Sequence, residues 1–233
     1  MANRPIFIPT PSAFPYVTAI ATEFEWYAGF SKTQAQKSIA ALHRAAAQSG
    51  VRSILEISSK SPTHIGVQLS AFNLILRYAG FTMSVECAFQ GSKVFEKGGP
   101  YQDLYTMSSR DAKHDPRLTS SGRIIGFRLS DQDVPTQPVT AFYDWLYLTA
   151  LVQHQELAGE VLSYEGFSDI AFNPEKSWNC QARSAALFVA LSKNHNVGEL
   201  VANLRAYLAL VRGTQQGGHV NDHDESNQLK LPW

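Results

Sequence analysis

The most restrictive feature of this sequence is the stretch that follows Thr140, AFYDWLYLTALVQHQELAGEVL. Its apolar residues are too closely spaced to form one stripe along a helix, so a helix there must be buried on several sides. The sequence therefore predicts a long central helix from Thr140 to Leu162. A chain of 233 residues is long enough to surround such a helix with one hydrophobic core.

Shorter patterns on either side predict the remaining elements. Ser31 is a suitable N-cap for a helix that Gly50 would end, and Ser84 is a suitable N-cap for a helix running to about Glu96. Residues 67–76 fit either a strand or a short helix. Helices are expected over 31–50, 84–96, 101–118, 177–191 and 196–213, and strands over 52–58 and 124–129.

These elements predict an α+β fold that is mainly helical, with a few short strands and a single domain. Residues 1–30 are expected to form an extended segment packed on the domain, which itself spans residues 31–213. Residues 214–233 are polar and Gly-rich, so we expect a mobile C-terminal tail.

Charge, cysteine content and hydropathy restrict the class of protein. Twenty basic residues balance twenty acidic ones, which argues against a protein that coats DNA non-specifically but not against recognition of a single nucleotide. Two cysteines do not make a disulfide framework. No segment approaches about 18 consecutive apolar residues, and the first residues lack the apolar core of a signal peptide. We therefore expect a reduced, cytosolic protein with no membrane contact.

Several common catalytic motifs are absent from the sequence. It contains no G-x-x-x-x-G-K-[ST] phosphate loop and no G-x-G-x-x-G after a predicted strand. It also contains no H-x-E…P-C-x-x-C deaminase signature, no H-E-x-x-H zinc helix and no G-x-S-x-G elbow. These absences argue against the corresponding enzyme classes.

The segment most suggestive of chemistry is MSVECAFQGSKVF, residues 83–95. On a helix, Glu86, Gln90 and Lys93 would share one face, because they lie at positions i, i+4 and i+7. Phe89 and its neighbours make the surroundings apolar. Burial of a carboxylate, an amide and an amine is costly unless they pair or meet a ligand. The alternatives are a solvated polar stripe or a simple ion pair between Glu86 and Lys93.

Three further residues are candidates with ordinary structural alternatives. Asp169 lies between apolar residues before an Asn-Pro turn, where an aspartate often serves only the turn. Asn179 is placed to cap or open a helix. Trp145 fits the core, unless it stacks on an exposed base. The tail residues His219, Asp222, His223 and Asp224 could bind a metal, but such ligands need structural support, and we predict no metal site.

The segment GFTMSVECAFQGSKVF resembles the hallmark of the NADAR family, which reads roughly W-P-[ST]-x-E-H-Y-[FY]-Q-A-Q-K-F. Glu86, Phe89, Gln90 and Lys93 fall on the family's Glu, aromatic, Gln and Lys without a gap. Asp169 falls where the family carries its second acidic residue, and the resemblance covers residues 69–191. Residues before 66 and the phrase VFEKGGPYQDLY resemble the branch encoded beside guanine-directed DarT toxins.

The sequence also departs from the family pattern. Met83 stands near the family's Trp-Pro, Cys87 and Ala88 replace its His-Tyr, and AFNP replaces the Trp-Gly that follows the second acid. Trp145 is the nearest match to a functional Trp of the family, but it is out of register. These departures concern the shape of the base pocket more than the carboxylates.

The resemblance implies a NADAR-type (YbiA-like) domain that cleaves the N-glycosidic bond between ADP-ribose and guanine in DNA, or RNA, without a cofactor. ADP-ribose would be the product, and the protein would be the antitoxin of a DarT-type toxin. The family reading assigns catalytic roles to Glu86, Asp169 and Lys93. Weaker candidates for substrate contact are Lys60, Ser70, Phe72, Asn73, Phe89, Gln90, Trp145 and Asn179.

The implied roles leave two routes open. Glu86 would stabilise an oxocarbenium-like cation or activate water, and Asp169 would position the ribose or the acid. Lys93 would either orient the diphosphate or Glu86, or attack an opened ribose as an iminium-forming amine. Two other functions remain possible at this stage: an N-glycosidase acting on a small metabolite, such as a riboflavin-pathway intermediate, and a non-catalytic immunity protein that binds the toxin.

Overall fold

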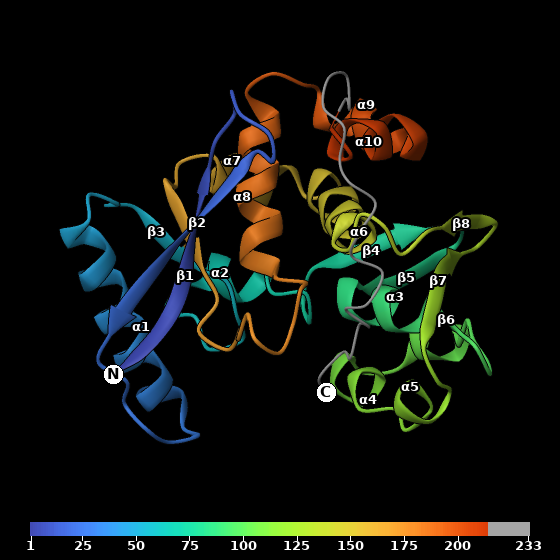
Figure 1. Cartoon of the computed structure of the whole chain (residues 1–233), viewed down its shortest axis with the longest axis horizontal. Coiled ribbons are helices and arrows are strands. Elements are labelled where there is room, and N and C mark those ends of the chain that lie inside the picture. Colours follow the sequence, from blue (N-terminus) through green and yellow to red (C-terminus); the bar gives the residue numbers. More distant parts are fainter. Residues whose placement is uncertain (214–233) are drawn as a thin grey trace, which may run out of the picture.

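Helix α6, Ala141–Val152, occupies the middle of the structure, a computed structural model that describes residues 1–213 (Figure 1). Every residue from 141 to 151 is buried, as the crowded apolar pattern predicts. The expected continuation to Leu162 is wrong, because the helix stops and α7, Gln155–Val161, begins after a break. At the break, the Gln153 side chain exchanges two hydrogen bonds with the backbone of Arg77, and His154 Nε2 lies 2.8 Å from the carbonyl oxygen of Ile75. These residues bind a strand edge instead of continuing the helix.

The largest sheet has four strands in the order β2-β1-β9-β3. They are β1, Ala2–Pro9; β2, Val17–Phe24; β9, Gly166–Ser168; and β3, Ile54–Glu56. Strand β9 pairs antiparallel with β1 and parallel with β3, so Glu56 lies opposite Ser168 at the ends of their strands. Strands β1 and β2 come from the N-terminal residues that were expected to be extended.

Helices cover this sheet on two sides (Figure 1). Helix α1, Lys32–Gln48, packs on one face, where Ile39 and Leu42 contact a small core that includes Ile6. Helix α8, Gln181–Ser192, packs on the other face, and the neighbouring residue Phe7 belongs to the main core. Successive residues of a strand point to opposite faces, which explains why Ile6 and Phe7 enter different cores.

Two smaller sheets complete the β-structure. Strands β4, Ile75–Tyr78, and β5, Phe81–Ser84, form a hairpin that leads directly into α3, Val85–Gly91. The third sheet consists of β6, Lys93–Phe95; β7, Ile124–Leu129; and β8, Gln132–Val134. The strand predicted over 124–129 is confirmed, and the ambiguous segment 67–76 contains the end of α2, His64–Gln68, and the start of β4.

The predicted helix over 84–96 is too long, because α3 ends at Gly91 and Lys93 begins β6. Gly91 packs so closely on Tyr105 that an added Cβ would lie 2.4 Å from a ring carbon. The Ser92 carbonyl oxygen accepts a hydrogen bond from Arg128 N–H at 2.7 Å, which draws the chain toward β7. The β-branched and aromatic residues that follow suit a strand.

The remaining helices are short. They are η1, Gln102–Thr106; α4, Ser109–Lys113; α5, Arg117–Ser120; α9, Val197–Ala202; and α10, Leu204–Val211. Ser31, Ser84 and Asn196 cap helices as predicted. Ser177 does not, because α8 begins only after Cys180, and Asn203 divides the helix expected over 196–213.

The described residues bear on the predicted fold class and on membrane crossing. The confirmed class is α+β with more helix than strand. Within residues 1–213, no helix combines the length and apolar character that a membrane crossing requires. The predicted C-terminal tail, with His219, Asp222, His223 and Asp224, lies outside the described residues.

Candidate active site

Glu86 lies in the first turn of α3, where the Ser84 side chain accepts a hydrogen bond from Cys87 N–H and starts the helix. The Glu86 side chain is buried, and its Oε1 accepts a hydrogen bond of 2.8 Å from Gln90 Nε2. This is the i, i+4 contact that the sequence predicts. The Glu86 backbone N–H also donates to the carbonyl oxygen of Ala71, at 2.9 Å, so the loop before β4 fixes the position of the acid.

Gln90 and Asn179 each present a buried oxygen with no hydrogen-bond partner among the described residues. These are the side-chain oxygens Oε1 of Gln90 and Oδ1 of Asn179. An unpaired buried acceptor costs about 1–3 kcal/mol, so native structures rarely keep one without a ligand, water or functional reason. Both residues are sequence-predicted ligand contacts, and both oxygens are suited to accept from a substrate N–H or O–H group.

Lys93 remains near Glu86 although it lies on β6 and not on α3. Its Nζ is 4.7 Å from the centroid of the Phe89 ring, a cation–π contact on the buried side of the helix. Burial lowers the pKa of the Lys93 amine to about 8, although the charge on Glu86 opposes the shift and that of Lys113 adds to it. A larger fraction of this amine is therefore neutral near pH 7 than for an exposed lysine.

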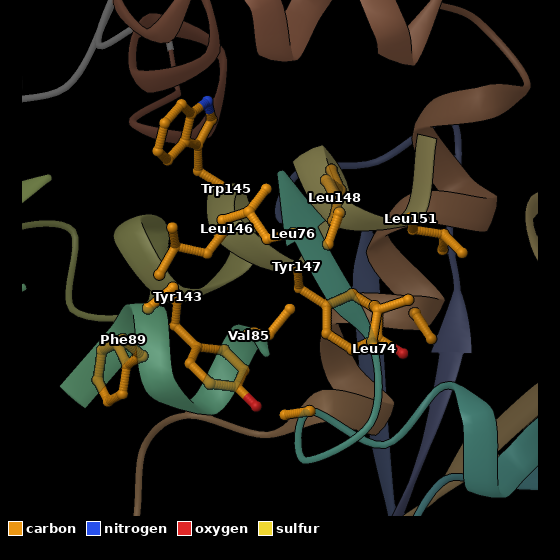
Figure 2. Close-up of a cluster of buried hydrophobic side chains, with 14 of the residues drawn as sticks. Leu74, Leu76, Val85, Phe89, Tyr143, Trp145, Leu146, Tyr147, Leu148 and Leu151 are labelled. Carbon is orange, nitrogen blue, oxygen red and sulfur yellow. The ribbon is translucent and has the colours of Figure 1, made fainter. Parts of the chain in front are cut away.

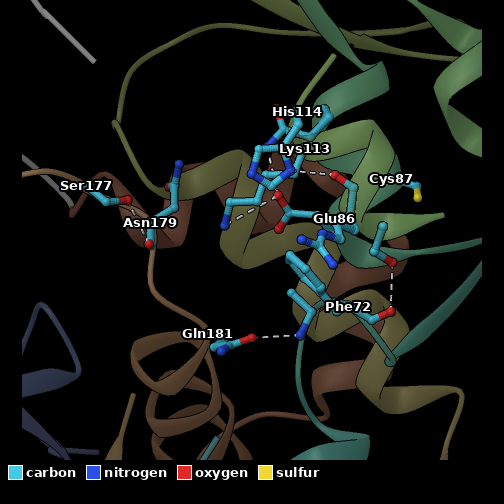
Figure 3. Close-up of polar contacts among 12 residues, drawn as sticks. Phe72, Glu86, Cys87, Lys113, His114, Ser177, Asn179 and Gln181 are labelled. Atoms are coloured by element: carbon cyan, nitrogen blue, oxygen red, sulfur yellow. Dashed lines mark hydrogen bonds and ion pairs between the residues drawn. The ribbon is translucent and has the colours of Figure 1, made fainter. Parts of the chain in front are cut away.

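Lys113, at the end of α4, is a second cation that the sequence analysis did not single out. Its Nζ lies 3.9 Å from Glu86 Oε1 and 5.2 Å from the centroid of the Phe72 ring. Figure 3 shows this amine reaching from α4 toward the Glu86 carboxylate. The side chain is half exposed, so the amine can contact both the buried acid and a ligand that arrives from solvent.

Asp169 follows directly after β9 and is buried. Its Oδ1 accepts from Ala171 N–H at 3.0 Å, and its Oδ2 accepts from Gln181 Nε2 at 3.0 Å. Burial raises the pKa of Asp169 to about 6, while these hydrogen bonds and the charge on Lys113 oppose the rise. The turn contact to Ala171 matches the ordinary structural role considered from the sequence, but the contact to Gln181 connects the acid to a distant helix.

A continuous set of hydrogen bonds connects the two acids. Gln181 donates to Asp169 Oδ2, and its Oε1 accepts from Ala71 N–H at 2.7 Å. The Ala71 carbonyl oxygen in turn accepts from Glu86 N–H. Figure 3 shows the hydrogen bond of the Gln181 side chain, which lies below Glu86 in that view. One glutamine thus connects Asp169 to the Ala71 loop, which in turn holds the backbone of Glu86.

The Tyr143 phenol on α6 is influenced by both acids. Burial raises its pKa well above the ordinary value, and the charges on Glu86 and Asp169 raise it further. Coulomb effects fall with distance, so the phenol lies within electrostatic range of both carboxylates. Residues 86 and 169, which are far apart in sequence, thus both act electrostatically on one phenol of α6.

The weaker candidates divide into two groups. Phe72 contributes its ring to Lys113, Ser70 Oγ accepts from Phe72 N–H, and Asn73 Nδ2 donates to the Val67 carbonyl oxygen at 2.9 Å, so these residues shape the loop beneath Glu86. Lys60 lies after β3, where its backbone N–H donates to Ser58 Oγ.

Trp145 is not brought together with the two acids. Figure 2 shows Trp145 and Tyr143 pointing to opposite sides of α6. The indole Nε1–H donates to the Val201 carbonyl oxygen at 2.9 Å, and the ring packs edge-on against Tyr78. The core role weighed from the sequence is the one observed.

Asn179 lies in the loop before α8, where its carbonyl oxygen accepts from Ser177 Oγ, and not in the first helical turn.

Two surface cavities lie beside α6 but are lined by other residues. A cavity of about 300 Å³ is bordered by Tyr78, Trp145 and Thr149, and one of about 170 Å³ by Tyr16 and Arg183. Neither is lined by Glu86 or Asp169. The candidate site is the pair of hydrogen-bonded acids, which stands out by the chemistry and charge of its residues and not by the size of a cavity.

Sequence reasoning missed Lys113, Tyr143 and Glu56. Glu56 is a completely buried carboxyl at the end of β3, and burial with the charge on Asp169 raises its pKa to about 8. A glutamate within the apolar strand ILEIS was the signal that could have identified it. Within the described part of the chain, no three His, Cys, Asp or Glu side chains group in a way that could hold a metal ion.

Comparison with known proteins adds one match. A family model described as the DarT1-associated NADAR antitoxin matches residues 2–220, which include both acids, Lys93 and Lys113. No curated protein matches the chain.

Proposed function

The chain belongs to the NADAR family, in its DarT1-associated antitoxin branch, and from this premise we propose that it is an N-glycosidase that removes ADP-ribose from guanine bases in DNA. The observation that carries the proposal is the pair of buried acids, Glu86 and Asp169, held in one hydrogen-bonded network beside two amines. Buried carboxyls of this kind suit a reaction that develops positive charge on a sugar.

The reaction breaks the bond between ribose C1 and a guanine nitrogen. Water supplies a hydroxyl group to C1 and a proton to the guanine nitrogen, so ADP-ribose and unmodified guanine are the products. Glu86 stabilises the cation-like sugar or deprotonates the attacking water. Its bond from Gln90 holds one carboxylate oxygen and leaves the other available to the substrate.

Asp169 orients the ribose in this scheme. Its raised pKa, about 6, leaves most of the group ionised at neutral pH, so it can accept hydrogen bonds from the sugar hydroxyls. Lys113 adds a positive charge at the exposed edge of the site, where the diphosphate of ADP-ribose would be attracted. The unpaired oxygens of Gln90 and Asn179 accept from polar hydrogens of the substrate.

Lys93 acts through its desolvated amine. In one route the ammonium donates a proton toward the departing base or orients Glu86. In the other, the neutral amine attacks C1 of the opened ribose, displaces the guanine amine, and is released by water. Treatment with a borohydride during turnover separates these routes, because only the second leaves ADP-ribose covalently attached to Lys93 as a reduced secondary amine.

The test of the proposed function is hydrolysis of an oligonucleotide that carries ADP-ribosyl-guanine, followed by release of ADP-ribose. A parallel panel of small N-glycosides measures the alternative metabolite activity. We expect turnover of the modified DNA and little turnover of the panel. An intact oligonucleotide at micromolar enzyme would contradict the proposal. Protection of toxin-expressing cells by Glu86→Gln would instead favour a protein that acts by binding the toxin.

A further inference from the structure

Glu56 is a buried carboxyl that the proposed chemistry does not use, yet it contacts both neighbours of Asp169. Its Oε1 accepts from the backbone N–H of Ile170 at 2.9 Å, and its Oε2 lies 2.5 Å from Ser168 Oγ. Ser58 Oγ adds a second hydrogen bond to Oε1, at 2.7 Å. Because residues 168 and 170 flank Asp169 in sequence, Glu56 holds the Ser168 side chain on one side of that acid and the Ile170 backbone on the other.

The contacts continue from Glu56 to helix α1. His43 Nε2 lies 2.8 Å from Ser168 Oγ, and His43 is half-buried. A serine hydroxyl carries one proton, so the direction of both bonds depends on the protonation of Glu56. If Glu56 is ionised, Ser168 donates to Glu56 and His43 donates through Nε2–H. If Glu56 is protonated, the proton is favoured on Oε2, because Oε1 already accepts from Ile170 N–H and Ser58 Oγ. Oε2 then donates to Ser168, and Ser168 donates to an unprotonated Nε2.

The electrostatics of the site favour the second arrangement. Burial and the charge on Asp169 raise the pKa of Glu56 to about 8, because two neighbouring carboxyls in an apolar environment cannot both ionise cheaply. Burial also lowers the pKa of His43 to about 4. A neutral imidazole can accept a hydrogen bond from Ser168 at Nε2, whereas an imidazolium has no free lone pair there and can only donate.

The other titratable groups around the pair do not reverse this order. Cys180, before α8, and the phenols of Tyr143 and Tyr147 on α6 are buried, and their pKa values are raised above the ordinary ones, so they stay neutral. Lys113 is the cation whose charge lowers the pKa of Asp169. The negative charge of the pair is therefore favoured on Asp169, whose ionised form the charge of Lys113 stabilises.

We propose that Glu56, Ser168 and His43 form a relay that stores one proton behind Asp169, so that Asp169 alone carries the negative charge of the buried carboxyl pair. Glu56 and Ser168 are positioning residues in this relay, since they act on the substrate only through Asp169. Its half-buried end, His43, is the exchange point through which the stored proton reaches or leaves Glu56.

The relay has a spectroscopic signature that requires no substrate. In nitrogen-15 NMR spectra of the full chain, His43 is expected as the Nδ1–H tautomer near pH 7 and is expected to change toward Nε2–H as Glu56 ionises above about pH 8. His43→Phe identifies the signal by removing it. Glu56→Gln keeps an N–H donor toward Ser168, so its His43 signal should remain Nδ1–H throughout. An Nε2–H tautomer at pH 7, or the same pH-dependent change in Glu56→Gln, would overturn the relay.

A second measurement rests on the proposed function and uses the ADP-ribosyl-guanine substrate. Glu56→Gln should change the shape of the kcat–pH profile above pH 7, with KM little altered, because it removes the proton that dissociates near pH 8. Equal scaling of kcat at every pH would contradict the relay and indicate a purely structural role. If the wild-type protein cleaves no substrate, the proposed function fails, while the tautomer measurement still decides the relay.

Discussion

The two acids of the site are held by different kinds of structure. Glu86 is held mainly by its own surroundings in sequence, since Ser84 starts its helix and Gln90 binds its carboxylate. Ala71 and Lys113 add contacts from other segments. Asp169 accepts from Gln181, and Glu56 binds the residues on either side of it, so its support comes from separate elements of the fold. One half of the site is therefore encoded largely in a short motif, and the other half mainly in the tertiary structure.

The largest expected effect separates the two acids by function. Glu86→Gln keeps the side-chain size and a contact to Gln90 but removes the charge, so kcat on the modified oligonucleotide should fall about 100- to 1,000-fold. Glu160→Gln, at an exposed position on α7, is the matched control and should keep wild-type turnover. Near wild-type kcat in Glu86→Gln would remove this acid from the mechanism.

A second effect concerns stability around Asp169. Glu56 has an ordinary pKa near 4.5, and burial raises it to about 8 in the fold, so the unfolded chain releases the proton first as the pH rises. The contribution of Glu56 to the free energy of unfolding is therefore fully present below about pH 4.5 and decreases between about pH 4.5 and pH 8.

Glu56→Gln removes this dependence. Its free energy of unfolding should match the wild type near pH 5 and exceed it by about 2–4 kcal/mol near pH 8, since each pKa unit corresponds to about 1.4 kcal/mol. Chemical denaturation at a series of pH values measures the difference. Parallel curves for the two proteins would show that Glu56 does not change its protonation with folding.

The connection between the two halves can be cut at one residue. Gln181→Met removes the donor to Asp169 and to the Ile57 carbonyl oxygen, and the acceptor for Ala71 N–H. We expect kcat to fall about tenfold, which corresponds to a net loss of about 1.4 kcal/mol in the positioning of the two acids. Gln155→Met, at an exposed position, is the control. An unchanged kcat would mean that the acids keep their arrangement without the glutamine.

The smallest expected effect is a gain in stability on the Glu86 side. The pKa of Lys93 is about 8 in the fold and 10.5 ordinarily, so the partly desolvated ammonium of this half-buried side chain disfavours the native state at neutral pH. Lys93→Met should raise the free energy of unfolding by about 1 kcal/mol. Lys193→Met, at an exposed site, should leave it unchanged. Destabilisation by Lys93→Met would mean that the contact with Phe89 outweighs desolvation.

The same contrast explains what could be predicted from the sequence. The buried helix α6, strand β7 and the contact between Glu86 and Gln90 follow from local spacing and are confirmed. The position of Lys93 was wrong in detail, because Gly91 must approach Tyr105 and pairing with β7 ends the helix early. Only tertiary packing reveals such a contact.

The surroundings of Asp169 could not be derived in this way. The family resemblance identifies Asp169 by its position, but neither its bond from Gln181 nor the contacts of Glu56 with Ser168 and Ile170. A parallel pairing between β3 and β9 gives no periodic signal that connects its two strands, which are more than 100 residues apart. Lys113 and Tyr143 were likewise hidden, because an exposed helix end and an aromatic core residue look ordinary in sequence.

Strand β9 lies between β1 and β3, which both precede it by more than 100 residues, and Asp169 follows it immediately. Gln181, which completes the hydrogen bonds to that acid, is made later still. A ribosome must therefore produce most of the chain before the site can assemble, and early segments wait for partners far downstream. A truncated product that stops just before Gln181 would contain both acids but lack the glutamine that holds them in one arrangement.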